Sequence, residues 1–202
     1  LVCEGTTGID PAALARGTSF LLGKEDQALF DSSIVIRDDP HRLRGLRSRA
    51  FDGEGLPTAA RDIVVDGKIT GWLLDTASAK QLGLEPTGHA SRGGGASGVS
   101  ASNLHLAAGT LTPEALMADI KEGIYVTELI GQGVNPVTGD YSRGASGFVI
   151  RDGQIAGPIA EFTVASNLVD MFAALIPAND LEFRHGTNVP TLRIDGMTVA
   201  SG

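Results

Sequence analysis

VTGDYSRGASGFVIRDGQIAGPIAEFTVASN, residues Val137–Asn167, is the stretch on which the interpretation of the fold rests. It contains two predicted strands, Gly147–Arg151 and Gln154–Thr163, which are separated only by Asp152-Gly153. Asp-Gly between apolar runs is a strong hairpin signal, because a type I′ turn needs positive φ at both central residues. The sequence therefore predicts a β-hairpin here.

A Gly-rich loop is predicted to lead into this hairpin, and it carries Asp140, Tyr141 and Arg143. Polar side chains on a loop that a rigid scaffold holds in place are a common setting for binding residues. We therefore expect a candidate site at the mouth of the hairpin.

A second Asp-Gly hairpin is predicted earlier in the chain, with strands Arg61–Val65 and Lys68–Leu74 around Asp66-Gly67. A short helix, Ala77–Leu82, should follow it, because Asp75 or Thr76 can cap its start and Gly83 can end it. The segment Gly88–Ser102 is rich in Gly and Ser and is predicted to be the least structured part of the chain.

The remaining elements follow from β-branched runs and helix-start signals, of which Thr112-Pro113-Glu114 is the strongest. The other predicted strands are Ser33–Arg37, Leu104–Ala108, Ile124–Ile130, Asp180–Arg184 and Leu192–Thr198, the last with a turn at Asp195-Gly196; the other predicted helices are Ala12–Phe20, Thr112–Glu122 and Leu168–Ala174. Strands dominate and helices are short, which predicts an antiparallel α+β or barrel-like domain. Predicted core residues are Trp72, Phe162, Leu168, Met171, Phe172 and Leu175.

Composition excludes some classes of function. The net charge of −8 argues against nucleic acid as a partner, since phosphate binding needs a basic face. Basic residues do cluster at His41–Arg49, but Asp38, Asp39, Asp52 and Glu54 flank them, so we interpret this cluster as a solvated or salt-bridged face. No apolar run has the length of a membrane span, and no signal peptide is visible. The single cysteine, Cys3, cannot form an internal disulfide, which fits a reducing compartment.

GQGVNPVTGDYSRGASGFVI, residues Gly131–Ile150, resembles the signature region of the PmbA/TldE branch of the TldD/TldE family, also called modulators of DNA gyrase. Further blocks that resemble the family lie in the same order along the chain: Arg16–Gly23, Asp38–Gly55, Lys80–Ala90 and Glu122–Asn135. The resemblance implies that residues 1–202 are a single PmbA/TldD C-terminal domain, and that the N-terminal domain of the family is absent from this sequence.

The family resemblance also implies a function. In this family a TldD and a TldE protein form a cytoplasmic zinc-metalloprotease complex that cleaves or matures unfolded peptides, as in microcin maturation and antitoxin degradation. TldD carries a His-Glu-x-x-x-His motif, whereas the corresponding segment here begins Cys3-Glu4 and supplies no second ligand. We therefore expect no metal ligands and no catalytic residues in this chain, and zinc in a TldD-type partner.

Five residues are predicted to contact a peptide substrate. Asp140, Tyr141 and Arg143 would receive an extended peptide at the mouth of the sheet, where main-chain hydrogen bonds can add a strand to a sheet edge. His89 and Arg92 would form an opposite, flexible wall. The alternatives are that Asp140 and Arg143 pair with each other and only pin the loop, and that His89 is only a surface residue. Two assemblies stay open, a heterodimer with a TldD-type protein and a homodimer; the alternative function is a non-enzymatic homodimeric peptide-binding or scaffold module.

Overall fold

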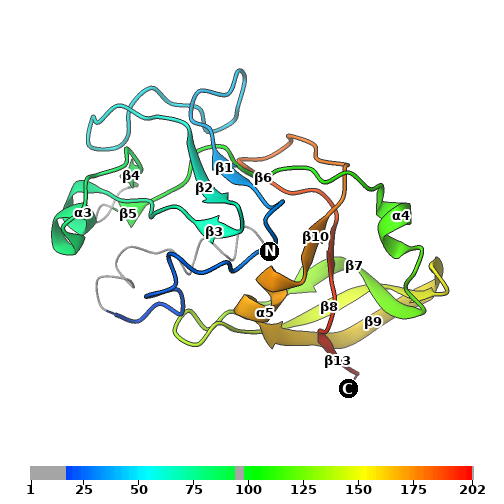
Figure 1. Ribbon diagram of the computed structural model, residues 1–202. Coiled ribbons are helices and arrows are strands. Elements are labelled where there is room, and N and C mark those ends of the chain that lie inside the picture. The colour runs from blue at the N-terminus through cyan, green and yellow to red at the C-terminus, as the bar shows by residue number, and fades with distance from the viewer. Residues whose placement is uncertain (1–16, 94–97, 202) are drawn as a thin grey trace. The chain divides into compact units, whose positions relative to one another are not determined.

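The computed structural model describes residues 17–93 and 98–201 (Figure 1). Contacts between residues divide the chain into two compact units. Unit 1 is Leu1–Ala107 with Leu181–Val189, and unit 2 is Ala108–Asp180 with Pro190–Gly202. Most of the predicted helix Ala12–Phe20 lies outside the described residues, and its described end forms turns instead of a helix.

The sheet of unit 1 has five short strands in the order β11-β6-β1-β2-β3. They are β1 (Ile36–Asp38), β2 (Arg61–Val65), β3 (Lys68–Ile69), β6 (Leu104–Leu106) and β11 (Thr187–Asn188). All neighbours are antiparallel except β11 and β6, which run parallel. The predicted strand Ser33–Arg37 is thus displaced toward Asp38, because the residues that pair with both β2 and β6 are Ile36–Asp38.

The hairpin of β2 and β3 turns at the predicted residues, with φ of 50° at Asp66 and 73° at Gly67. Its second strand ends at Ile69 and does not reach Leu74. Beyond Gly71, which has a φ of 157°, the chain leaves the sheet, and Trp72 is buried. The core of this unit also includes Leu21, Ile34, Ile63, Val64, Leu73, Leu74, Leu104 and Leu106.

Helix α3 (Thr76–Leu82) confirms the predicted caps. The Ser78 backbone N–H donates to the Asp75 carboxylate over 2.8 Å, and Gly83 ends the helix in the left-handed conformation. The segment predicted to be least structured contains two short paired strands, β4 (Ala90–Ser91) and β5 (Gly98–Val99).

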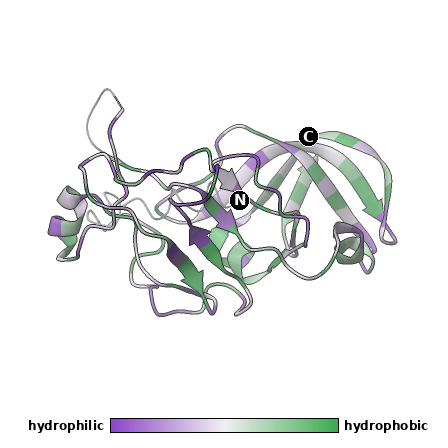
Figure 2. Cartoon of the chain, turned by 90° about the horizontal axis from the view of Figure 1, so that it is seen from above, coloured by the Kyte–Doolittle hydropathy of each residue, from purple (hydrophilic) through white to green (hydrophobic). Residues whose placement is uncertain are grey.

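The sheet of unit 2 has four antiparallel strands in the order β13-β9-β8-β7. They are β7 (Glu122–Ile130), β8 (Asp140–Arg151), β9 (Gln154–Asn167) and β13 (Thr198–Ser201). The predicted Asp-Gly hairpin joins β8 to β9, with φ of 47° at Asp152 and 76° at Gly153. Seen from above in Figure 2, the long strands carry both hydrophobic and hydrophilic positions, as expected for a sheet with one buried face.

The predicted Gly-rich loop before this hairpin is wrong, because Asp140–Ala145 belongs to β8 and pairs along its length with β9. Within this segment, a Cβ at Gly144 would meet only ordinary van der Waals contacts with Ile130 of β7. A side chain at Gly147 would collide with the Tyr125 carbonyl of β7, so this position needs glycine although it lies within a strand. A sequence rich in glycine was thus mistaken for a loop.

Two helices lie in unit 2. Helix α5 (Leu168–Ala173) follows its predicted N-cap, Asn167, and buries Leu168, Met171 and Phe172, as predicted. Helix α4 (Pro113–Met117) starts after Thr112 as predicted but ends at Met117 instead of Glu122. The hairpin turn explains the early end, since Asp152 and Gly153 donate backbone hydrogen bonds to the carbonyls of Lys121 and Ile120.

The predicted closing strand Asp180–Arg184 is wrong. The structure has β10 (Leu175–Pro177) instead, paired with β12 (Leu192–Ile194). Asp180 is an anchor for a turn, because its carboxylate accepts from both the backbone N–H and the hydroxyl of Thr191. The chain bends at the predicted Asp195-Gly196, where Gly196 has a φ of 79°. The bend divides the predicted strand Leu192–Thr198 into β12, which pairs with β10, and β13, which pairs with β9. The antiparallel α+β class is confirmed, without a closed barrel in the described part. No described helix is long and apolar enough to cross a membrane.

Candidate functional site

The five predicted site residues fall into two groups. His89 and Arg92 belong to unit 1, whereas Asp140, Tyr141 and Arg143 belong to unit 2. Each group is therefore described within its own unit.

His89 is buried and belongs to a network of polar side chains. Its Nε2 lies 3.0 Å from Asp38 Oδ2, and both side chains are almost fully excluded from solvent. Ser102 completes the shell of Asp38, donating its backbone N–H to Oδ1 over 2.8 Å and its hydroxyl to Oδ2 over 2.6 Å. Every carboxylate oxygen of Asp38 thus has a donor.

Thr87 occupies the other side of the His89 ring. Its Oγ1 lies 2.9 Å from His89 Nδ1 and accepts the Leu74 backbone N–H over 2.7 Å. Both ring nitrogens of His89 are therefore engaged inside the protein, and the network ties β1 to the segments before β4 and β6. Buried polar groups persist when each is hydrogen-bonded. The interior position of His89 differs from the flexible wall expected from the sequence, and also from the surface alternative.

Asp52 forms a second buried carboxylate site beside β4. Its Oδ1 accepts the backbone N–H groups of Glu54 and Leu56, and its Oδ2 accepts that of Ala90, all within 3.0 Å. Burial alone would raise the pKa of Asp52, but these three donors and the nearby Arg49 charge outweigh it and hold the pKa below its usual value. The turn that follows Asp52 is thus fixed against β4.

Arg92 lies just after β4 and its side chain is exposed. The backbone of this segment packs on the turn that Asp52 fixes, since the Gly53 N–H donates to the Ala90 carbonyl over 2.8 Å. Of the two predicted residues in unit 1, Arg92 is therefore the one that faces solvent.

Asp140 begins β8 and is exposed. Its Oδ2 accepts the Thr138 hydroxyl over 2.6 Å, and its Oδ1 accepts the Asn167 amide over 3.3 Å. The Thr138 hydroxyl and then the Asn167 amide lower the pKa of Asp140. The alternative in which Asp140 pairs with Arg143 is wrong, because residues three apart in a strand point to opposite faces of the sheet and Asp140 bonds to other partners.

Tyr141 and Arg143 follow on β8. Tyr141 is only 2% exposed, so it is part of the core of unit 2. Arg143 is half-buried, and its guanidinium donates to the Leu129 carbonyl of β7 over 3.2 Å. Arg143 thus reaches across the sheet toward its edge strand.

Strand β7 is the edge of this sheet in the described part of the chain, with β8 as its one strand partner. It is nine residues long and exposes the apolar side chains of Val126 and Ile130. The backbone groups on the outer side of an edge strand have no partner strand, so such an edge can accept an added strand. A β-bulge between Val126 and Glu128 interrupts its pairing with β8.

Three of the histidines, His41, His89 and His105, have side-chain contacts within the chain. No three of the His, Asp, Glu or Cys side chains described here gather as metal ligands. His41 Nε2 contacts the Thr58 hydroxyl, His89 is held by Asp38 and Thr87, and His105 packs edge-on against the Phe183 ring. Burial lowers the pKa of His105. Cys3 and Glu4 lie outside the described residues.

Comparison with known proteins identifies this antiparallel α+β chain as a metallopeptidase-family domain. Residues 6–201 match the model of the PmbA/TldA metallopeptidase C-terminal domain. The Metalloprotease PmbA of Escherichia coli O157:H7 is 40% identical over 186 residues, and a PmbA homolog of Haemophilus influenzae is 38% identical over 201 residues. The chain belongs to the PmbA/TldD metalloprotease family.

Solved structures agree with this assignment. A putative modulator of a DNA gyrase from Thermotoga maritima superposes with a TM-score of 0.85 at 28% identity, over 95% of this chain and 45% of that one. TldE from Thermococcus kodakarensis, at 24% identity and a TM-score of 0.83 over 96% of this chain and 46% of that one, has the same fold. The two curated relatives are covered over 40% and 43% of their length, and they cover 92% and 99% of this chain.

Proposed function

We propose that this chain is part of a PmbA/TldE-type subunit of a cytoplasmic TldD–TldE zinc-metalloprotease complex, in which it helps to form the substrate chamber and is not itself catalytic. The observation that carries the proposal is family membership over residues 6–201, together with the engagement of the His41 and His89 side chains in contacts within the chain. The substrates would be unfolded peptides, as in microcin-type maturation or antitoxin degradation.

Peptide binding would use the outer edge of β7, which has no partner strand among the described residues. An extended peptide adds to such an edge through main-chain hydrogen bonds, which do not depend on the peptide's sequence. The half-buried Arg143 lies against the carbonyl of Leu129 on this strand and supplies positive charge beside the edge. Val126 and Ile130 supply exposed apolar surface for side chains of the peptide.

The predicted substrate-binding residues would act in two ways. Arg92 and Asp140 are exposed and can contact a peptide directly, as can Arg143. His89 and Tyr141 are buried, so their contribution would be to position the backbone that carries the exposed groups. The zinc and the water that attacks the peptide bond would be supplied by the TldD-type partner.

Metal content and peptidase activity of the intact protein, alone and mixed with a TldD-type protein of the same organism, test this proposal. We expect less than stoichiometric zinc and no cleavage of an unfolded casein substrate for the protein alone, and cleavage on mixing beyond that of the TldD-type protein alone. Stoichiometric zinc that survives dialysis, together with activity of the protein alone, would overturn the proposal.

The alternative function is a non-enzymatic homodimeric peptide-binding or scaffold module. The outer edge of β7, unpaired within residues 17–93 and 98–201, also favours this function, because strand addition needs no catalytic group. Partner dependence separates the two functions. A scaffold would bind the unfolded peptide equally well with or without the TldD-type protein, and mixing would add no cleavage.

A further inference from the structure

Arg42 is a half-buried arginine of unit 1 that lies on an aromatic ring. Its guanidinium is 3.2 Å from the centroid of the Phe183 ring. No hydrogen bond or ion pair joins this guanidinium to a residue within 17–93 or 98–201. Arg44 and Arg47 of the same basic cluster are exposed, as predicted for a solvated face. Arg42 differs from them, because it is held against the protein surface without an acidic partner in the described part.

The backbone at Arg42 is fixed by hydrogen bonds. Its carbonyl accepts the Gly45 backbone N–H over 3.0 Å and the Ser48 hydroxyl over 2.7 Å. Buried Asn103 holds the far side of this loop, since its Oδ1 accepts the Arg47 backbone N–H over 3.0 Å and its Nδ2 donates to Ser48 Oγ over 2.9 Å. The position from which the Arg42 side chain starts is thus defined by the fold.

The chain around Phe183 is fixed in a similar way. Buried Asn188 accepts the backbone N–H groups of Arg184 and His185 at its Oδ1, each over 2.8 Å, and donates its amide to the His185 carbonyl over 2.7 Å. Phe183 immediately precedes this turn, and its side chain remains 40% exposed. Because ring and loop are both held in place, Arg42 is ordered before a ligand arrives, which lowers the entropy that it loses on binding.

His105 of β6 also contacts the Phe183 ring. The two ring centroids are 5.1 Å apart in an edge-on arrangement. Nδ1 of His105 is shielded from solvent and has no hydrogen-bond partner among the described residues, which is uncommon for a buried polar atom. Burial lowers the pKa of His105, and the positive charges of Arg42 and Arg37 lower it further. The ring of His105 is therefore neutral at neutral pH and lies within electrostatic reach of Arg42.

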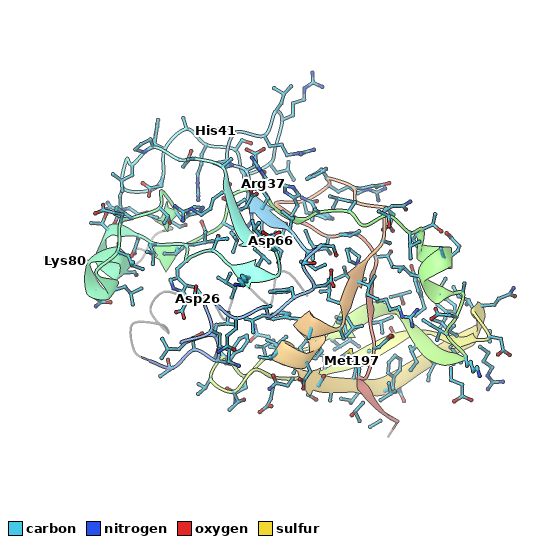
Figure 3. The ribbon with its side chains drawn as sticks, in the orientation of Figure 1. Asp26, Arg37, His41, Asp66, Lys80 and Met197 are labelled. Atoms are coloured by element: carbon cyan, nitrogen blue, oxygen red, sulfur yellow. The ribbon has the colours of Figure 1, made fainter. Side chains whose placement is uncertain are left out.

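The nearby carboxylates have other partners. Arg37, which Figure 3 labels together with His41, pairs in register with His105 across β1 and β6 and donates to Asp62 over 3.1 Å. Asp39 accepts the His41 backbone N–H over 3.0 Å. Among the described basic groups around Phe183, the guanidinium of Arg42 is thus available to a carboxylate from outside the chain.

We propose that Arg42, stacked on Phe183, binds the C-terminal carboxylate of an extended peptide. Stacking uses the face of the guanidinium and leaves its edge, where paired N–H donors match the two oxygens of a carboxylate. Phe183 and the 89% exposed Leu43 supply apolar surface for the last side chain of the peptide. The peptide would be that of the proposed function, on which this assignment rests, but binding at Arg42 requires neither cleavage nor a TldD-type chain.

A carboxylate suits Arg42 better than a phosphate does. One guanidinium matches one negative charge, whereas a phosphate dianion is best held by several cations, and Arg37 is already engaged by Asp62. The net charge of −8 also opposes a polyanion such as nucleic acid. Acidic side chains inside a peptide offer the same chemistry as its C-terminus, so the two sources have to be separated by experiment.

Fluorescence anisotropy with the intact protein alone tests the assignment. Three short apolar peptides with an N-terminal rhodamine dye are compared: one with a free C-terminus and no acidic side chain, the same peptide with a C-terminal amide, and the amide with one internal glutamate. We expect the free acid to bind about tenfold or more tightly than either amide, because only its carboxylate reaches the guanidinium.

Variants locate the binding at Arg42. Arg42→Ala should weaken binding of the free acid about tenfold or more and leave the amide unchanged, and Arg42→Lys should restore only part of the loss, because lysine keeps the charge without the paired donors. Lys80→Ala is the matched control, since Lys80 is exposed on α3 of the same unit and gives the same change in charge. Its dissociation constant should stay within about twofold of that of the wild type. Circular dichroism checks that each variant is folded.

Several outcomes would overturn the assignment. Equal binding of the free acid and the amide would do so while leaving peptide binding itself intact, as would equal weakening by Lys80→Ala. Tight binding of the amide with an internal glutamate would assign Arg42 to acidic side chains, and displacement by inorganic phosphate at lower concentration than by acetate would assign it to phosphate. A wild-type protein that binds none of the peptides would also overturn it. Carboxylate-dependent binding without cleavage on mixing with a TldD-type protein would contradict the proposed function alone.

Discussion

His89 Nε2 lies 3.0 Å from Asp38 Oδ2 in the interior of unit 1, where both side chains are at most 2% exposed. Removing one partner of a buried polar pair leaves the other incompletely hydrogen-bonded away from water, which is strongly destabilising. We therefore predict that His89→Ala lowers the free energy of unfolding by about 2–4 kcal/mol, measured by urea denaturation at neutral pH.

Arg92→Ala is the control for His89→Ala. Arg92 is exposed on the same segment of unit 1, so its removal should change the free energy of unfolding by no more than about 0.5 kcal/mol. If His89→Ala unfolds at the same urea concentration as the wild type, the network around Asp38 does not stabilise the fold.

Asp52 makes a contribution to stability that depends on pH. Its folded-state pKa lies below its unfolded-state value, because three backbone donors and Arg49 outweigh the effect of burial. Such a group stabilises the fold above its unfolded-state pKa of about 4, and this contribution is lost as pH falls through the folded-state pKa. Asp52→Asn should therefore lower the free energy of unfolding by about 1.5–3 kcal/mol at pH 7.

The difference between Asp52→Asn and the wild type should shrink below about pH 4, as the wild-type carboxylate becomes protonated. Urea denaturation of both proteins at neutral and acidic pH measures it. A difference that stays constant over this range would mean that the charge of Asp52 is not what stabilises the turn.

Gly153 and Gly196 allow the cost of a positive φ to be separated from the cost of a steric collision within unit 2. Both have positive φ, 76° and 79°, so alanine is strained at either position. An added Cβ at Gly153 would also come within 2.7 Å of the Ala118 carbonyl oxygen, whereas at Gly196 no atom lies within 4 Å. We predict a loss of about 1 kcal/mol for Gly196→Ala and a clearly larger loss for Gly153→Ala, by thermal or urea denaturation. Equal losses would mean that the β8–β9 turn moves away from α4 freely.

Turns and caps could be predicted from the sequence because their causes are local. Asp152-Gly153 and Asp66-Gly67 close hairpins, and Asp75 and Asn167 cap helices, each through residues a few positions apart. The strand that replaced the Gly-rich loop could not be predicted in this way. Asp140–Ala145 is a strand because it pairs with residues of β9 from Asn167 to Phe162, and that pairing depends on the folded sheet.

In the candidate site, too, local features could be predicted from the sequence and long-range contacts could not. The segment around Asp140 could be selected from its polar residues, but nothing in the sequence indicated that Tyr141 would be buried. Asp38 appeared to be one of several acidic residues beside a basic cluster. Its partners, His89 and Ser102, are 51 and 64 positions away in the chain, so only the fold reveals that it is a buried anchor.

Arg143 provides the test of the proposed peptide site. Its guanidinium lies at the Leu129 carbonyl of the edge strand β7, where an added peptide would bring further carbonyl groups. For the protein mixed with a TldD-type partner, Arg143→Ala should raise the KM for an unfolded peptide about tenfold, which corresponds to about 1.4 kcal/mol. The kcat should change less, because Arg143 is proposed to bind substrate and not to act on the scissile bond.

Arg151→Ala is the matched control for this variant, since Arg151 is exposed at the far end of β8 and makes the same change in charge. It should leave the KM within about twofold of the wild-type value. Urea denaturation of both variants separates a loss of binding from a loss of folding. If Arg143→Ala retains the wild-type KM while folding normally, the peptide does not bind beside Arg143, and the edge of β7 is not the substrate site.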